Sequence, residues 1–102
     1  MQIYAETQGN ALHVYLRGEI DEYSAKTARI QADEIARKHV QSERAVFNLI
    51  GVSFMDSTGI GFLLGRYKTF RALGIPTYIT GARTETDRIL QMSGIYSLMP
   101  KI

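Results

Sequence analysis

The chain has 102 residues, of which 45% are hydrophobic and 22% are charged, as is usual for one globular domain spanning residues 1–102. Twelve Lys and Arg residues face ten Asp and Glu residues, and cysteine is absent, which excludes disulfides and thiolate metal sites. No apolar run approaches the roughly 20 residues that span a bilayer, and the N-terminus lacks the features of a secretory signal. We therefore expect a cytoplasmic protein without membrane contact.

The first half of the chain predicts a hairpin, a helix and a buried strand. Residues 3–7 and 11–17 are predicted to be strands, because apolar residues alternate along the second and a Gly-Asn turn separates them. Alanines then recur at helical spacing over residues 25–36, and Ser24 is a candidate N-cap. The apolar run 45–50 predicts a strand that is covered on both faces.

The second half predicts two more helices and two more strands. A helix should run from Ser57 to the glycine at position 74, followed by a strand over residues 76–80. Thr84 with Asp87 resembles a capping box that opens a short helix. A last strand over residues 98–102 is weakened by its proline. The order β-β-α-β-α-β-α-β predicts an α/β fold with a mixed, mostly parallel sheet and packed helices.

One segment carries a possible mechanism: Phe54-Met55-Asp56-Ser57-Thr58-Gly59-Ile60-Gly61, between the buried strand and a helix. In α/β sheets, functional residues often lie at the carboxyl ends of strands. Either Asp56 or Ser57 can cap the helix, which contributes about 1 kcal/mol. A phosphate on Ser57 would instead meet free N–H groups and the positive end of the helix dipole. The pattern alone leaves both interpretations open.

Three glycines in the helix that begins near Ser57 also require an explanation. Each of Gly59, Gly61 and Gly65 costs up to about 1 kcal/mol relative to alanine inside a helix. Close packing on the sheet is a structural reason, and a smooth surface for a docking partner is a functional one.

Enzymatic chemistry is poorly supported, so we expect a protein that is not an enzyme. Met55 replaces the first glycine of a serine-hydrolase G-x-S-x-G motif, and neither His13 nor His39 neighbours Ser57 in sequence. No phosphate-binding loop is present, and the acidic residues show no metal-ligand spacing. We expect no cofactor and no metal.

The basic residues Arg66, Lys68 and Arg71 cluster in one short stretch. Such a patch is weak evidence for nucleic acid binding. We expect it to be a solvated helix face, without direct contact to nucleic acid.

The chain resembles the STAS family, specifically the bacterial anti-sigma-factor antagonists, over nearly its whole length. Three segments carry the resemblance: Gly18-Glu19-Ile20-Asp21, Phe54-Met55-Asp56-Ser57-Thr58-Gly59-Ile60-Gly61, and Met92-Ser93-Gly94-Ile95. The resemblance implies that an anti-sigma-factor serine kinase binds the unphosphorylated chain, which frees the sigma factor. The kinase, which itself holds ATP and Mg²⁺, then phosphorylates Ser57, and a metal-dependent serine phosphatase reverses this. The implied partner-binding residues are Asp21, Asp56, Ser57, Thr58, Gly59 and Gly61.

The resemblance leaves the pathway and the wider role open. The segment Gly65-Arg66-Tyr67-Lys68 resembles antagonists that act in sporulation, so we favour sporulation control. General-stress antagonists are at least as similar in two other places, the segment Gly18-Glu19-Ile20-Asp21-Glu22-Tyr23-Ser24-Ala25 and Thr58. A STAS module can also be an accessory subunit of a lipid transporter or a scaffold in a signalling assembly. Relatives usually continue into a final helix beyond the position of Ile102, so one flank of the sheet is expected to be less covered.

Overall fold

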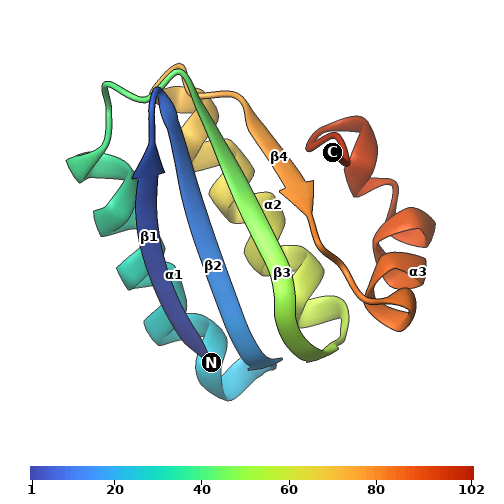
Figure 1. Cartoon of the computed structure of the whole chain (residues 1–102). Helices are drawn as coiled ribbons and strands as arrows, with labels where there is room; N and C mark the ends of the chain where they lie inside the picture. Colours follow the sequence, from blue (N-terminus) through green and yellow to red (C-terminus); the bar gives the residue numbers. More distant parts are fainter.

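The fold is built on one sheet of four strands in the order β1-β2-β3-β4 (Figure 1). The computed structural model describes residues 1–102. β1 (Gln2–Gln8) and β2 (Ala11–Ile20) pair antiparallel, whereas β3 (Arg44–Met55) and β4 (Thr77–Thr80) continue the sheet parallel to β2. The sheet is therefore mixed and mostly parallel, which confirms the predicted α/β class.

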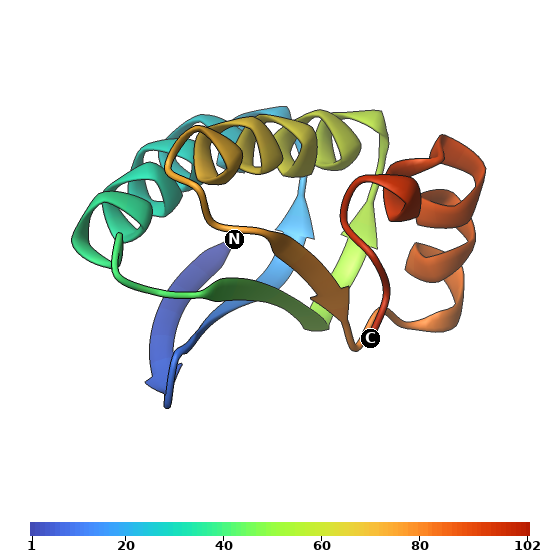
Figure 2. The same cartoon turned by 90° about the horizontal axis from the view of Figure 1, so that it is seen from above.

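Two helices cover one face of this sheet, and a third lies beside its β4 edge (Figure 2). α1 (Glu22–Lys38) connects β2 to β3, and α2 (Ser57–Ala72) connects β3 to β4. α3 (Thr84–Ser93) and a short 3-10 helix (Ile95–Ser97) follow β4. The opposite face of the sheet carries no helix, so the expectation that residues 45–50 are covered on both faces holds only at the start of this run, where Val46 is buried. Ile50 points to that open face and is 59% exposed.

α1 packs closely on the sheet through four alanines, as the sequence predicts. These buried residues are Ala25, Ala28, Ala32 and Ala36. The predicted N-cap is wrong: Asp21, not Ser24, is the N-cap of α1. Ser24 is the third residue after the N-cap and completes a capping box with Asp21. Its hydroxyl oxygen accepts a hydrogen bond from the Asp21 N–H at 3.2 Å. The helix therefore begins earlier than its alanine periodicity indicates.

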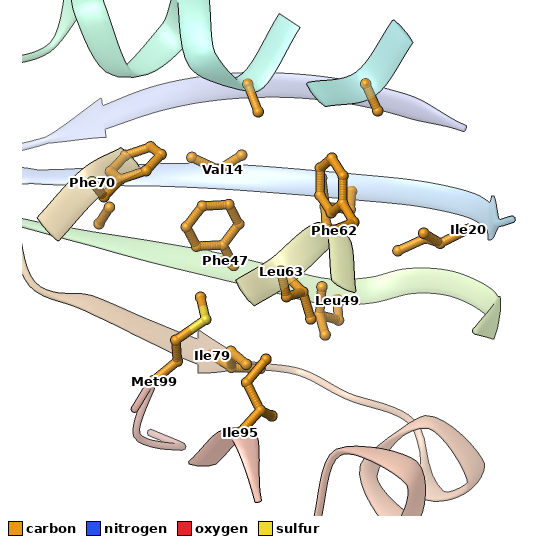
Figure 3. Packing of buried hydrophobic residues seen from close by; sticks show 14 of the residues in the cluster. Val14, Ile20, Phe47, Leu49, Phe62, Leu63, Phe70, Ile79, Ile95 and Met99 are labelled. Carbon is orange, nitrogen blue, oxygen red and sulfur yellow. The ribbon is translucent and has the colours of Figure 1, made fainter. Parts of the chain in front are cut away.

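The core lies between the sheet and the two helices, and aromatic rings dominate its centre (Figure 3). Phe47 of β3 and Phe70 of α2 meet edge to face, with ring centroids 5.4 Å apart. Between the helices, Arg66 Nε lies 2.9 Å from Asp33 Oδ1, and the Arg66 side chain is only 4% exposed. The basic residues at positions 66, 68 and 71 therefore do not form one solvated face, because Arg66 joins α2 to α1.

The C-terminal segment is held by one short backbone bridge and by side chains instead of a full strand. Only one bridge, between Ile79 and Lys101, forms where a last strand was predicted, and it includes the bond from the Ile79 N–H to the Pro100 carbonyl. The predicted capping box at Thr84 is also wrong, because α3 starts one residue earlier, with Arg83 as an N-cap that makes no side-chain bond. Asp87 instead accepts hydrogen bonds from Tyr96 Oη at 2.6 Å and Lys101 Nζ at 2.9 Å.

The Asp87 cluster predicts a loss of stability in acid. The hydrogen bonds from Tyr96 and then Lys101 hold the pKa of Asp87 below its usual range. The cluster should therefore stabilise the fold fully above the ordinary carboxyl pKa of about 4, and this contribution should disappear as pH falls through the lowered pKa. Asp87→Asn should be less stable than wild type near neutral pH and equally stable in strong acid, as measured by thermal unfolding across pH. Glu85→Gln, an exposed carboxylate of the same helix, is the matched control, and equal pH profiles for Asp87→Asn and wild type would contradict the assignment.

Candidate functional site

Two helix N-termini meet at the carboxyl edge of the sheet. Ile20 at the end of β2 pairs with Met55 at the end of β3. The residues that follow directly, Asp21 and Asp56, are the N-caps of α1 and α2. Because their strands are parallel neighbours, both carboxylates lie at the same edge, where functional residues of α/β sheets often gather.

Asp56 and Ser57 have separate roles at the start of α2. The Asp56 backbone is extended, and its Oδ1 accepts a hydrogen bond from the Thr58 N–H at 2.9 Å. Ser57 is the first helical residue, is exposed, and its hydroxyl makes no hydrogen bond within the chain. The cap is therefore Asp56 alone, and the Ser57 hydroxyl is free to react or to contact a partner.

The first turn of α2 offers fewer free N–H groups than the sequence predicts for a phosphate site. The Asp56 side chain occupies the Thr58 N–H. The N–H groups of Gly59 and Ile60 both point to the Asp56 carbonyl, at 3.0 and 3.3 Å. A phosphate on Ser57 would therefore meet mainly the Ser57 N–H and the helix dipole, next to the carboxylate of Asp56.

Asp21 is also engaged as a cap, at the start of α1. Its Oδ1 accepts hydrogen bonds from the N–H groups of Tyr23 and Ser24, each at 3.0 Å. The bond from the Ser24 N–H is the main reason that the pKa of Asp21 lies below its usual range. Asp21 therefore stays ionised at neutral pH and places a second negative charge beside Asp56.

The structure distinguishes the three glycines of α2. A Cβ at Gly59 would overlap Met55 Cγ and lie 3.3 Å from Ile20 Cγ2, so this position is glycine because the helix lies directly on the sheet. A Cβ at Gly61 or Gly65 would meet no atom within 4 Å. Packing therefore explains Gly59 and does not explain Gly61 or Gly65.

Two exposed aromatic residues at this edge were missed in the sequence analysis. Tyr23, in the first turn of α1, is 88% exposed, and Phe54, near the end of β3, is 50% exposed. Each lies two residues from one of the capping aspartates. Phe54 belongs to a segment that resembles the family and Tyr23 lies just after another, but only the structure shows that their side chains are not part of the core.

The other polar candidates do not join the site. His39 follows the far end of α1, where its Nδ1 lies 2.7 Å from the Ile35 carbonyl oxygen. His13 lies within β2, with its ring 6.3 Å from that of Tyr15. No three His, Cys, Asp or Glu side chains are grouped so that they could hold a metal ion. None of the helices is both long and apolar enough to span a membrane.

Comparisons with known proteins show what this chain is similar to. The STAS domain model matches residues 2–102. The anti-sigma F factor antagonist of Paenibacillus polymyxa is 36% identical over 100 residues, which cover 98% of this chain and 85% of that protein. The anti-sigma-B factor antagonist of Staphylococcus aureus strain NCTC 8325 is 30% identical, covering 97% of this chain and 90% of that protein. Both relatives are regulators and not enzymes, which confirms the prediction of a non-enzymatic protein.

A solved structure has the same fold. The phosphorylated form of SpoIIAA, described as a Bacillus cell fate determinant, superposes with a TM-score of 0.70 at 22% identity. The superposition covers 99% of this chain and 91% of that one.

The distinction between the glycines can be tested by alanine substitution. Gly59→Ala should lower the free energy of unfolding by about 1–2 kcal/mol, because overpacking against Met55 outweighs the gain in helix propensity. Gly61→Ala is the matched control and should raise it by about 0.5–1 kcal/mol, because the added methyl group meets open space. Denaturant unfolding of both variants measures these changes. A stabilising Gly59→Ala substitution would show that α2 can move away from the sheet.

Proposed function

The chain belongs to the STAS domain family, and from this premise we propose that it is an anti-sigma factor antagonist controlled by phosphorylation of Ser57. The unphosphorylated form binds an anti-sigma factor that is also a serine kinase, and the sigma factor is released. The exposed hydroxyl of Ser57, free of internal hydrogen bonds at the start of α2, is the observation that carries the proposal. A kinase can reach this hydroxyl without unfolding the protein, because Asp56 and not Ser57 caps the helix.

Phosphorylation of Ser57 would change the binding of the partner and leave the fold of this chain unchanged. A phosphate on Ser57 adds a charge of about −1.5 to −2. The carboxylates of Asp56 and Asp21 already lie at the same edge of the sheet. A closely packed partner surface has no room or compensating groups for the added phosphate, whereas the Asp56 cap still stabilises α2. Binding is therefore switched while the domain remains folded.

The proposed partner-binding surface consists of the two caps and the exposed start of α2. Asp21, Asp56, Ser57, Thr58 and Gly61 are at least partly exposed and can touch a partner. Gly59 is buried, so it contributes by positioning the helix instead of by contact. Tyr23 and Phe54 supply apolar area beside these polar groups, and exposed aromatic residues are common at the centres of interfaces.

The rest of the switching cycle is supplied by partners. We propose that the kinase binds ATP and Mg²⁺, that a metal-dependent serine phosphatase removes the phosphate, and that both act with this chain in the cytoplasm. We favour sporulation control, because identity to the anti-sigma F factor antagonist is 36%, against 30% for the anti-sigma-B factor antagonist. General-stress regulation by the same mechanism is the alternative.

The proposal predicts one phosphorylation site. Incubation with ATP, Mg²⁺ and an anti-sigma-factor serine kinase from the same organism should add one phosphate to the wild-type protein and none to Ser57→Ala, as measured by intact mass. Thr58→Ala is the matched control, because Thr58 is the adjacent hydroxyl residue on α2, and it should accept one phosphate. Phosphate on Ser57→Ala would overturn the assignment of Ser57.

The proposal also predicts a binding role for Asp21 that is separate from its cap. Asparagine caps a helix about as well as aspartate, so Asp21→Asn should keep the melting temperature of wild type. The proposal places the Asp21 carboxylate opposite a positive charge of the kinase. The substitution should therefore slow association about tenfold at low salt, and the difference from wild type should shrink as salt is added. Binding kinetics at two salt concentrations measure this effect. Glu22→Gln, the next acidic residue of α1, is the control, and equal kinetics for Asp21→Asn and wild type would limit Asp21 to capping.

A further inference from the structure

The open face of the sheet, away from the Ser57 edge, contains a groove that is lined by aromatic, aliphatic and basic side chains. Tyr4, Tyr15, Arg17, Ile50 and Arg83 line this hollow of about 320 Å³, which we call the open-face groove. Tyr4 is 54% exposed and Ile50 is 59% exposed, although both lie on strands of a folded sheet. From this groove we infer a second interaction surface, which docks an acidic peptide segment of a protein partner.

Two glycines give the groove its shape. Arg17 of β2 pairs with Gly51 of β3, and a Cβ at position 51 would lie only 3.1 Å from Arg17 Cγ. The missing side chain therefore lets the stem of Arg17 lie across β3. Gly81 adopts a φ of +74°, and a Cβ there would lie 3.3 Å from the Ile50 Cβ. Because of this close approach, the segment after β4 lies against Ile50 of β3, and Arg83 in this segment reaches the groove.

The two arginines approach the groove from different elements, and neither has an acidic partner. Arg83 donates from Nε to the Ile50 carbonyl at 2.9 Å, which fixes the side chain and leaves its terminal N–H groups free. Arg17 is exposed and takes part in none of the three ion pairs of the chain. Guanidinium groups bind carboxylates through paired, charge-assisted hydrogen bonds. The groove thus presents two unused sites for carboxylate recognition.

The floor between the arginines is aromatic and apolar. The rings of Tyr4 and Tyr15 stack with centroids 4.8 Å apart and planes within 10° of each other. The Ile50 side chain borders the same hollow. A ligand that combines carboxylates with an aromatic or aliphatic side chain would satisfy both the arginines and this floor.

The shape and charge of the groove favour a peptide over other occupants. It lies open on a sheet face, whereas small-molecule sites are concave and bury most of the ligand. A nucleic acid requires a larger group of cations, and Glu6 lies on this same face, opposite His13. A second copy of this chain carries a net charge of +2 and would bring the same two arginines against each other. An acidic segment of another protein matches the exposed arginines without these conflicts.

The test uses the full ¹⁵N-labelled chain and the peptide acetyl-Gly-Asp-Phe-Glu-Phe-Asp-Gly-amide. The peptide should shift the amide signals of β2, of β3 around position 50 and of residues 81–83, and salt should weaken its binding. The same peptide with Asn and Gln in place of its acidic residues should bind at least tenfold more weakly. Arg17→Gln should weaken binding of the acidic peptide about tenfold, whereas Arg37→Gln, an exposed arginine of α1, should leave it unchanged.

Further variants separate docking from folding and from the proposed switch. Arg83→Gln should weaken binding as Arg17→Gln does, and a melting curve shows whether loss of its bond to Ile50 affects the fold. Ser57→Asp should leave peptide binding unchanged, because the open-face groove lies on a different surface. Equal binding of the neutral peptide, shifts centred on α1 and α2, or no binding at about 1 mM peptide would overturn the inference. So would tighter binding of oligouridylate, or self-association through this face.

Discussion

The first turn of α2 lies directly on the side chains of Met55 and Ile20, and only glycine at position 59 permits this approach. The contact ties the helix to the ends of β2 and β3, which are also the strands that precede the two capping aspartates. Ser57 lies two residues before Gly59, at the rim of this packed turn. The exposure of its hydroxyl is therefore a consequence of core packing, and the proposed switch depends on a contact that no partner touches.

The two aspartates at this edge combine a structural and a proposed functional role. Each accepts backbone N–H groups at the start of a helix, and each places a charge at the surface where a partner would bind. Because both helix N-termini point to the same edge, their dipoles partly offset the two carboxylates. An added phosphate would meet only the Ser57 N–H and the helix dipole, since the N–H groups of the next three residues are already occupied. The edge can therefore change its charge greatly while its backbone stays the same.

The two faces of the sheet have different roles in the architecture. The helices bury one face and supply the core, and the ion pair between the buried Arg66 and the half-buried Asp33 links them to each other. The other face keeps tyrosine, isoleucine and arginine side chains at its surface, shaped by Gly51 and Gly81. The Ser57 edge and the open face are formed by different side chains, so each surface can be altered by substitutions that leave the other unchanged. A sheet covered by helices on both faces would have lost the second surface.

The features that depend on near neighbours along the chain could be predicted from the order of the residues alone. Alternation in residues 11–17 and the alanine spacing of α1 gave the α/β class, and the Asp56-Ser57 junction marked the candidate site. Which of these two residues caps the helix, and why Gly59 differs from Gly61, became clear only from the folded chain. The folded chain also shows that Arg66 is buried and that Ile50 lies on an uncovered face. Periodicity and capping depend on residues within one helical turn or strand, whereas burial and close approach depend on side chains brought from distant parts of the chain.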